Sequence, residues 1–167
     1  QELRLLNLAL VDVGAGTSDI AVADGGTVSG YTMATVAGDE ITERIMQELL
    51  VDFTAAEQMK LQLSQPGKLL PYHDVLGFEY EISTDELAAK ITPAVEELAQ
   101  SIAAGIRQAG GGNTPKAVFL VGGGSRTPGL CALVAKVLGV DEKRVAVGGS
   151  NYMKRMVLAD EQYLQAE

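Results

Sequence analysis

Apolar residues at the start of the chain fall into short runs that are typical of β-strands. Two such runs, residues 5–13 (LLNLALVDV) and 18–23 (SDIAVA), are separated by a glycine-rich turn. A third run, residues 27–36, follows the pair Gly25 and Gly26, which is a strong signal for a hairpin turn. We therefore predict three consecutive strands that pair in an antiparallel meander.

The spacing of the apolar residues then changes to a helical period. On a first predicted helix, over residues 37–50, one face carries four apolar side chains: Ile41, Ile45, Leu49 and Leu50. A second helix is predicted over residues 52–65. Thr54 is its expected N-cap, because Glu57 follows three positions later.

The middle of the chain is less regular. Residues 65–82 contain two prolines and two glycines, and we expect an irregular segment with a strand-like tail. Ser83 and Glu86 then form a capping box, which predicts the start of a helix, with Thr84 as the alternative cap one residue later. A longer helix is predicted over residues 92–109, because Pro93 fits its first turn and the sequence GGGN ends it.

The last third of the chain is predicted to form strand–helix units. Residues 117–124 (AVFLVGGG) are continuously apolar before the glycines, which favours a strand buried on both faces. An amphipathic helix over residues 126–139 and a short strand over residues 144–147 follow. The expected fold class is α/β, a three-stranded antiparallel meander followed by helices and strand–helix units.

Length and composition are those of a single globular domain. The chain has 167 residues, of which 47% are hydrophobic, so it can bury a substantial core. We assign residues 1–150 to one domain and residues 151–167 to a C-terminal tail or linker helix. Because the chain begins at Gln1 rather than Met, we expect it to be part of a longer protein.

The net charge of the chain limits the classes of ligand that it is expected to bind. A formal net charge of −9 argues against binding to nucleic acid or to anionic membranes. Binding of a nucleotide is still compatible with this negative charge, since Mg²⁺ and backbone N–H groups can neutralise phosphates locally. The single Cys131 cannot form an internal disulfide, which fits a cytoplasmic location. No apolar run approaches the roughly 18 residues of a spanning helix, and we expect no direct membrane insertion.

The turn between the first two predicted strands is the first candidate site. Gly14 and Gly16 would let backbone N–H groups face an anion without an intervening side chain. Asp12 could reach a hydrated Mg²⁺, and Thr17 could donate a hydrogen bond to a phosphate. From the turn alone an ordinary hairpin is the better interpretation. A second acid beyond the glycines, Asp19, weakens that alternative.

A second candidate site is the stretch FLVGGGSRTPGL, residues 119–130. It leads from a strand through three glycines into a helix, and such a connection lets a flat ligand approach the backbone closely. Arg126 could stack on an aromatic base or pair with a phosphate. The alternative is a tight strand–helix connection capped by Ser125 or Thr127.

A third candidate lies on the predicted helix over residues 52–65. In the sequence AEQMKLQLS, Glu57 and Lys60 are three positions apart and share one helix face. Taken alone, this spacing is better interpreted as a solvated ion pair.

Together the three stretches resemble motifs of the actin-like ATPase superfamily, which includes actin, sugar kinases, DnaK-type chaperones, MreB and FtsA. VDVGAGTSDIAV resembles the second phosphate motif, VGGGSRTPGL the adenosine motif, and AE-x-x-K the helix that borders the adenosine. Their order and spacing agree over residues 6–140. The chain looks most similar to FtsA-like cell-division proteins. The resemblance implies a ribonuclease-H-like, actin-type ATPase domain, the second of two.

The resemblance implies ATP and Mg²⁺ as ligands, with a role for each motif. Asp12 would hold the water shell of Mg²⁺, and Asp19 is the second acid on the metal side. The phosphates would face four residues of the turn: Gly14, Ala15, Gly16 and Thr17. Many members have glycine where this chain has Ala15. The ribose or base would meet Glu57 and Lys60. The adenosine would be bordered by four residues of the later loop: Gly123, Gly124, Ser125 and Arg126.

The resemblance also implies a function shared with residues outside this sequence. The family's first phosphate motif and first domain do not occur in it, so we expect weak ATP binding and little hydrolysis from this chain alone. Whether the full-length protein hydrolyses ATP is open. The leading interpretation is nucleotide-dependent assembly or cell division, with the N-terminal domain, further copies or a division-type protein as partner. A DnaK-type chaperone or reactivating factor and a sugar or small-acid kinase are the alternatives.

Overall fold

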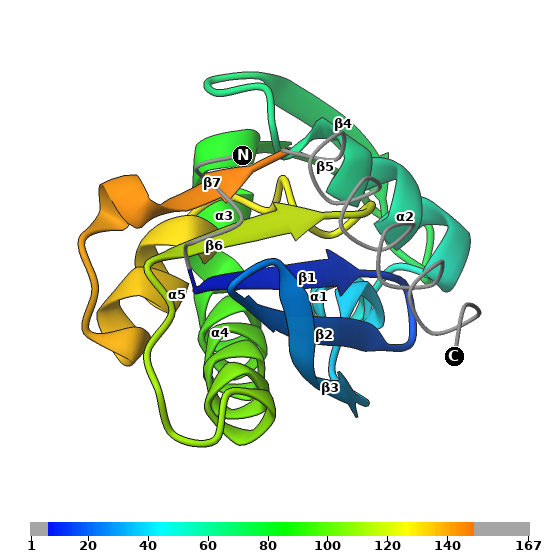
Figure 1. Cartoon of the computed structure of the whole chain (residues 1–167). Helices are drawn as coiled ribbons and strands as arrows, with labels where there is room; N and C mark the ends of the chain where they lie inside the picture. Colours follow the sequence, from blue (N-terminus) through cyan, green and yellow to red (C-terminus); the bar gives the residue numbers. More distant parts are fainter. Residues whose placement is uncertain (1–6, 149–167) are drawn as a thin grey trace.

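A computed structural model describes residues 7–148 (Figure 1). Its main sheet has five strands in the order β3-β2-β1-β6-β7. Their bounds are Leu8–Val13 for β1, Ser18–Asp24 for β2, Thr27–Ala34 for β3, Ala117–Val121 for β6 and Val145–Val147 for β7. Strands β1 to β3 pair antiparallel, whereas β6 is parallel to both β1 and β7. The predicted tail over residues 151–167 lies outside the described residues.

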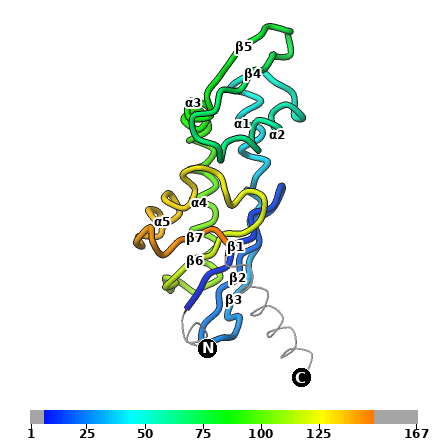
Figure 2. The backbone as a smooth tube through the Cα atoms, turned by 90° about the horizontal axis from the view of Figure 1, so that it is seen from above, coloured from blue at the N-terminus to red at the C-terminus, as the bar shows by residue number. Residues whose placement is uncertain are grey.

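The described residues also contain a two-stranded hairpin and five α-helices. Their bounds are Gly38–Leu49 for α1, Phe53–Gln62 for α2, Leu69–His73 for β4, Glu79–Ser83 for β5, Thr84–Lys90 for α3, Thr92–Ala109 for α4 and Leu130–Leu138 for α5. A single 3₁₀ turn, Glu142–Arg144, precedes β7. Figure 2 shows α1, α2, α3 and the hairpin gathered in a small lobe at one end, with the main sheet, α4 and α5 at the other.

The predicted antiparallel meander is confirmed. Gly25 and Gly26 have φ angles of 64° and 89°, so both turn residues are left-handed. Two left-handed residues are what a type I′ hairpin turn requires, and glycine adopts this conformation at little cost. At the other end of β2, Asp19 pairs in register with Asp12 of β1, across the glycine-rich turn.

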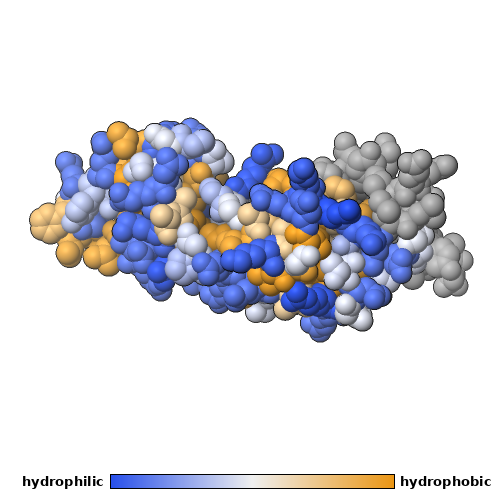
Figure 3. Space-filling view, turned by 90° about the vertical axis from the view of Figure 1, so that its left-hand side faces the viewer, coloured by the Kyte–Doolittle hydropathy of each residue, from blue (hydrophilic) through white to orange (hydrophobic). Residues whose placement is uncertain are grey.

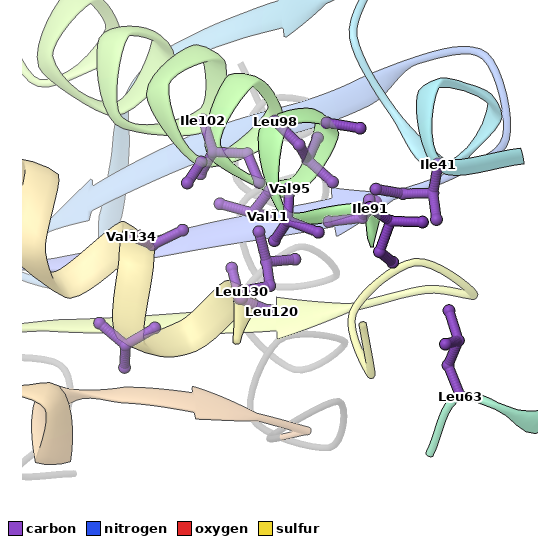
Figure 4. Packing of buried hydrophobic residues seen from close by; sticks show 14 of the residues in the cluster. Val11, Ile41, Leu63, Ile91, Val95, Leu98, Ile102, Leu120, Leu130 and Val134 are labelled. Atoms are coloured by element: carbon purple, nitrogen blue, oxygen red, sulfur yellow. The ribbon is translucent and has the colours of Figure 1, made fainter. Parts of the chain in front are cut away.

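The main core lies between the sheet and the pair of helices α4 and α5. Val11 and Leu120 come from neighbouring parallel strands and are fully buried. Figure 4 shows them pointing toward residues of the two helices that are also buried: Val95, Leu98, Ile102, Leu130 and Val134. Helix α4 has the predicted bounds, because Pro93 fits its first turn and Gly110 follows its last residue.

The opposite face of the main sheet is only partly covered. On β3 its side chains include Tyr31 and Met33, which are 64% and 55% exposed. On β6 the pattern alternates: Val118 and Leu120 are buried, while Phe119 is half-buried. The prediction that this strand is buried on both faces was therefore wrong, because α4 and α5 both pack on the same side.

Two details of α1 and α2 differ from the prediction. Leu50 is exposed rather than part of the apolar face, because it has φ 53° and ends α1 in the left-handed conformation. The N-cap of α2 is Asp52 and not Thr54: the Asp52 carboxylate accepts a hydrogen bond from the N–H of Ala55 at 2.8 Å. Asp52 is extended, with φ −77° and ψ 174°, as an N-cap residue is.

The segment predicted to be irregular is a hairpin. Strand β4 was missed because Pro71 interrupts its apolar pattern. Among residues 7–148, however, β4 pairs with β5 alone, and a proline is tolerated in such an edge strand. The rings of Tyr72 and Tyr80 stack across the pair, with their centroids 5.5 Å apart. Asp74 holds the turn, since its carboxylate accepts from the N–H of Leu76 at 2.9 Å and from a second turn amide.

The small lobe ends in an exposed apolar surface at this hairpin turn. Leu76 and Phe78 are 72% and 62% exposed. The N–H of Val75 donates to the carbonyl oxygen of Leu50 at 2.8 Å, so the turn is fixed to the end of α1. Apolar residues gather over this lobe at the left end of Figure 3.

The helix caps explain where the remaining helices start. Ser83 caps α3 as predicted, because its hydroxyl accepts from the N–H of Glu86 at 3.1 Å. Helix α5 begins at Leu130, four residues later than predicted, because Gly129 has φ 82° and cannot belong to a right-handed helix. Gly139 ends it in the left-handed conformation, as predicted. None of the helices within residues 7–148 has the length and apolar character needed to cross a membrane.

Candidate functional site

Two glycine loops lie side by side at one edge of the main sheet. The first loop, residues 14–17, follows β1, and the second loop, residues 122–126, follows β6. Because β1 and β6 are parallel neighbours, their carboxyl ends meet at the same edge, where ligands of α/β sheets commonly bind. The N–H of Gly124 donates to the carbonyl oxygen of Val13 at 3.0 Å, so the second loop is fixed to the start of the first.

Asp12 lies between the two loops. It is exposed, and its carboxylate lies against the backbone of Gly122: a Cβ on Gly122 would come within 2.4 Å of Asp12 Oδ1. Within residues 7–148 this carboxylate has no hydrogen-bond or ion-pair partner. Mg²⁺ keeps several waters and is commonly held through one or two carboxylates. The position of Asp12 fits such a hydrated ion.

Asp19 is a poorer candidate for the metal. It is the register partner of Asp12 on β2, so the two side chains leave the same face of the sheet. However, the hydroxyl of Tyr31 donates to Asp19 Oδ1 at 2.9 Å. This hydrogen bond, together with desolvation and the negative charge of Asp19, raises the pKa of Tyr31. One oxygen of Asp19 is therefore already engaged.

The first glycine loop is fixed to the beginning of α1. The N–H of Gly38 donates to the carbonyl oxygen of Gly14 at 2.9 Å, and the N–H of Asp39 donates to that of Ala15 at 2.7 Å. Inside the loop, the N–H of Gly14 donates to the carbonyl oxygen of Thr17 at 3.0 Å. The N–H groups of Ala15 and Gly16 have no acceptor among the described residues, and both residues are exposed. They are free to donate to an anion.

Lys60 and Glu57 form an ion pair that approaches the first glycine loop. Lys60 Nζ lies 3.1 Å from Glu57 Oε1, and the two side chains are only 18% and 33% exposed. Lys60 also donates to the hydroxyl of the buried Thr42 at 2.8 Å and to the carbonyl oxygen of Gly38 at 3.4 Å. The N–H of Gly38 donates to the first loop at Gly14, so Gly38 is hydrogen-bonded both to that loop and to Lys60 of α2.

The ionisation of Glu57 reflects this cluster. Burial raises its pKa, but the hydrogen bonds from Thr42 and Lys60 and the positive charge of Lys60 outweigh burial. The pKa of Glu57 therefore lies below its ordinary value, and Glu57 is a carboxylate at neutral pH. The interpretation of Glu57 and Lys60 as a purely solvated pair does not describe this arrangement, because Thr42 is fully buried beneath them.

Side-chain hydroxyls hold the second glycine loop in shape. Ser125 donates to the carbonyl oxygen of Gly122 at 2.7 Å, and Thr127 donates to that of Gly124 at 2.8 Å. Neither residue caps α5, so this part of the alternative interpretation of the loop was wrong. Ser125 is buried, and its hydroxyl is engaged within the loop.

A hollow of about 420 Å³ opens beside the second loop. Arg126 lines it together with residues from the end of α2, from α3 and from β7: Leu63, Ser64, Pro66, Thr84, Asp85, Ala88, Pro128 and Val147. The guanidinium of Arg126 has no partner among the described residues. An unpaired planar cation beside an apolar hollow is suited to stacking on a flat ring.

The structure thus brings most of the predicted site residues together. The residues of the first loop, Asp12 and the residues of the second loop meet at one sheet edge, and Lys60 reaches them through Gly38. The role of Thr42 and Gly38 in this connection was missed. The signal for it was the segment VAGDEIT, which follows the predicted meander and contains both residues.

The chain matches the family model described as Cell division protein FtsA over residues 9–166. It is 28% identical over 146 residues to the cell division protein FtsA of Pseudomonas aeruginosa, and 29% identical over 172 residues to that of Bacillus subtilis. These regions cover 82% and 95% of this chain but 35% and 37% of those proteins. The chain therefore spans about a third of the length of the curated relatives that it matches.

Solved structures share the fold of this chain at low sequence identity. A chain of the PilM–PilN type IV pilus biogenesis complex has a TM-score of 0.66 at 22% identity, over 88% of this chain and 37% of that one. The protein EutJ of Carboxydothermus hydrogenoformans has a TM-score of 0.62 at 20% identity, over 86% and 44%. MreB 5 of Spiroplasma citri, solved with AMPPNP, has a TM-score of 0.66 at 16% identity, over 97% and 54%.

Proposed function

This chain belongs to the family of the cell division protein FtsA and has the fold of the actin-like ATPases, and from that premise we propose that it forms one wall of an Mg²⁺-ATP site. The nucleotide would control assembly of the full-length protein in cell division. The observation that carries the proposal is the convergence of the two glycine loops and the Lys60 cluster at one sheet edge. Each of these segments comes from a separate part of the sequence.

The phosphates are assigned to the first glycine loop. The N–H groups of Ala15 and Gly16 are exposed and unpaired among the described residues, so they can donate to phosphate oxygens. The chain is acidic overall, with a net charge of −9. Electrostatic neutralisation of the phosphates would therefore depend on local groups and on Mg²⁺, which Asp12 would hold through water.

The base is assigned to the hollow beside Arg126. Its volume of about 420 Å³ is within the range of small-molecule sites. The apolar side chains of Leu63 and Val147 can contact the faces of a ring, and the guanidinium of Arg126 can stack on it. The second loop lies between the hollow and the first loop: Arg126 lines the hollow, and the N–H of Gly124 donates to the carbonyl oxygen of Val13, next to the first loop. The nucleotide is proposed to extend from one to the other.

Binding and switching, rather than hydrolysis by this chain alone, are the activity that we propose. The residues at this edge would orient phosphates and metal, but the resemblance to actin-like ATPases implies a site shared with a first domain outside this sequence. Weak binding by the isolated chain and tighter binding by the full-length protein are expected. The full-length protein is proposed to be cytoplasmic and to assemble with further copies or with a division-type protein, which is consistent with the exposed apolar surface at Leu76 and Phe78.

The test is calorimetric titration of ATP into full-length protein with and without Mg²⁺. Asp12→Ala should lower the Mg²⁺-dependent affinity at least about tenfold, which is roughly 1.4 kcal/mol. Its melting temperature should stay close to that of the wild type, because Asp12 is exposed and unpaired among the described residues. The matched control is Asp24→Ala, an exposed acid at the far end of β2, which should bind normally. Equal binding by both variants would reject the site.

A further inference from the structure

The two acids that face each other beside the first glycine loop are not equally free, because a tyrosine of the next strand holds one of them. We infer that Tyr31 is a positioning residue that sets the ion selectivity of the proposed site: by engaging Asp19 Oδ1 it favours a hydrated Mg²⁺ over Ca²⁺. The inference rests on the proposed Mg²⁺-ATP function and names the side chain that would select the ion. Asp12 lies on β1, Asp19 on β2 and Tyr31 on β3.

Tyr31 reaches Asp19 along a diagonal of the sheet. Strands β1, β2 and β3 are neighbours in the sheet (Figure 1), and the residue directly opposite Tyr31 on β2 is Ala21, two positions beyond Asp19. Diagonal neighbours on one face of a sheet are within reach of an aromatic side chain. The small side chain of Ala21 leaves room for the ring to lie across β2, and the Tyr31 hydroxyl donates to Asp19 Oδ1 at 2.9 Å.

The direction of this hydrogen bond makes Tyr31 a donor to the metal side and not a ligand of it. A phenol is neutral at neutral pH and has a single proton, which Tyr31 donates to Asp19. Hydrogen bonds to a carboxylate are among the stronger ones in proteins. The Tyr31 side chain is 64% exposed, so its hydroxyl acts mainly on the orientation of Asp19 and not on the core.

The contact reduces the number of carboxylate oxygens that are free for an ion. Asp12 has no hydrogen-bond or ion-pair partner within residues 7–148, so both of its oxygens are available. Asp19 has one available oxygen, Oδ2, since Oδ1 accepts from Tyr31. Asp19 therefore cannot bind an ion through both oxygens without losing this hydrogen bond.

Mg²⁺ and Ca²⁺ make different demands on these oxygens. Mg²⁺ keeps several of its waters and is commonly held through one or two carboxylates, whereas Ca²⁺ takes about six to eight oxygen ligands and often binds a carboxylate through both oxygens. Within residues 7–148 no group of three or more acidic, histidine or cysteine side chains could hold a metal, so a Ca²⁺ shell would depend on Asp12 and Asp19. Tyr31 blocks the bidentate mode of Asp19 that Ca²⁺ would use.

The test compares the affinity of full-length protein for ATP in excess Mg²⁺ with that in excess Ca²⁺, by calorimetry. Tyr31→Phe keeps the ring but releases Asp19 Oδ1. The ratio of the two affinities, Mg²⁺ over Ca²⁺, should fall at least about threefold in this variant, as expected for the loss of one hydrogen bond. The matched control is Tyr80→Phe: Tyr80 is 50% exposed and lies on β5 of the small lobe, and this variant should keep the wild-type ratio.

A double-mutant cycle tests whether Tyr31 acts through Asp19. Asp19→Asn replaces the carboxylate whose orientation Tyr31 controls. In the Asp19→Asn background, Tyr31→Phe should leave the ratio of the two affinities unchanged. A further fall as large as that in the wild-type background would show that Tyr31 acts on the ion by another route, and it would contradict the inference.

Separate outcomes address the inference and the function on which it rests. No binding of ATP by the wild type with either ion would overturn both. Asp12-dependent ATP binding with a wild-type ratio in Tyr31→Phe would overturn only this inference. Equal weakening of ATP binding in Mg²⁺ and in Ca²⁺ would show that Tyr31 has a purely structural role, and it would overturn the inference as well.

Discussion

Gly122 is the position where the structure leads to the sharpest quantitative prediction. It has φ 90°, and a Cβ there would lie 2.4 Å from Asp12 Oδ1 and 2.6 Å from the carbonyl oxygen of Val13. Gly122→Ala therefore combines two costs. The positive φ costs about 1–2 kcal/mol, and forcing a methyl group against a backbone carbonyl costs about 1–3 kcal/mol more. We expect about 2–5 kcal/mol of lost unfolding free energy.

A second glycine separates the two costs. Gly112 has nearly the same φ, 91°, but a Cβ there would have nothing within 4 Å. Gly112→Ala should therefore lose only about 1–2 kcal/mol. Urea denaturation of both variants measures the difference. Equal losses in the two variants would show that the second loop does not press against β1 as the structure describes.

The same pair of variants also reports on the site. In Gly122→Ala the new methyl group would push the Asp12 carboxylate away from its position between the loops. Mg²⁺-dependent ATP binding should therefore fall in full-length Gly122→Ala at a temperature where the variant is still folded. Gly112→Ala, whose substitution is far from Asp12 in the fold, should bind as the wild type does.

Two further predictions concern α2 and the ion pair. Asp52→Ala should lower the unfolding free energy by about 1 kcal/mol through loss of the N-cap, whereas Thr54→Ala should lower it little. A larger decrease of the unfolding free energy in Thr54→Ala than in Asp52→Ala would contradict the assigned cap. The pKa of Glu57 is lower in the folded protein than its ordinary value of 4.5, so its contribution to stability is complete above that value and lost as the pH falls through the folded pKa. Stability measured by denaturation from about pH 6 to about pH 3 should therefore decline less steeply in Glu57→Gln than in the wild type, and identical slopes would contradict the lowered pKa.

Local signals in the sequence were sufficient for most of the helices and strands. Helix α4 was predicted over its observed residues because Pro93 and a run of glycines mark its two ends. The hairpin at Gly25 and Gly26 was predicted because few residue pairs other than glycine accept two left-handed conformations in succession. These signals act over a few residues, and no distant contact competes with them.

The predictions were wrong where two local signals in the sequence compete, or where the packing of distant elements determines the structure. Asp52 and Thr54 are both acceptable N-caps, and the choice between them depends on where the chain leaves α1. Strand β4 was missed because of Pro71, since the sequence does not show that β5 is the single neighbour of this strand in the part of the chain that the structure describes. The exposure of Phe119 depends on which side of the sheet α4 and α5 occupy.

The separate segments of the candidate site were identified from the sequence, but the hydrogen bonds that join these segments were not. Gly14 to Thr17 and Gly123 to Arg126 were recognised from their motifs, because glycines at the end of a strand let a ligand approach the backbone closely. The hydrogen bond from Thr42 to Glu57 joins residues 15 positions apart on two helices. This hydrogen bond depends on how α1 packs on α2. A threonine in a helical sequence does not by itself indicate which partner its hydroxyl has.

The most direct test of the central claim is an NMR titration of full-length protein with ATP and Mg²⁺, following individual backbone amides. If the two glycine loops form one site, the amide resonances of Ala15, Gly16, Gly123 and Gly124 should shift together at the same nucleotide concentrations and should depend on Mg²⁺. The amide of Gly25, at the other end of β2, should not move. Shifts confined to one loop, or shifts in neither loop under saturating ATP, would contradict the account.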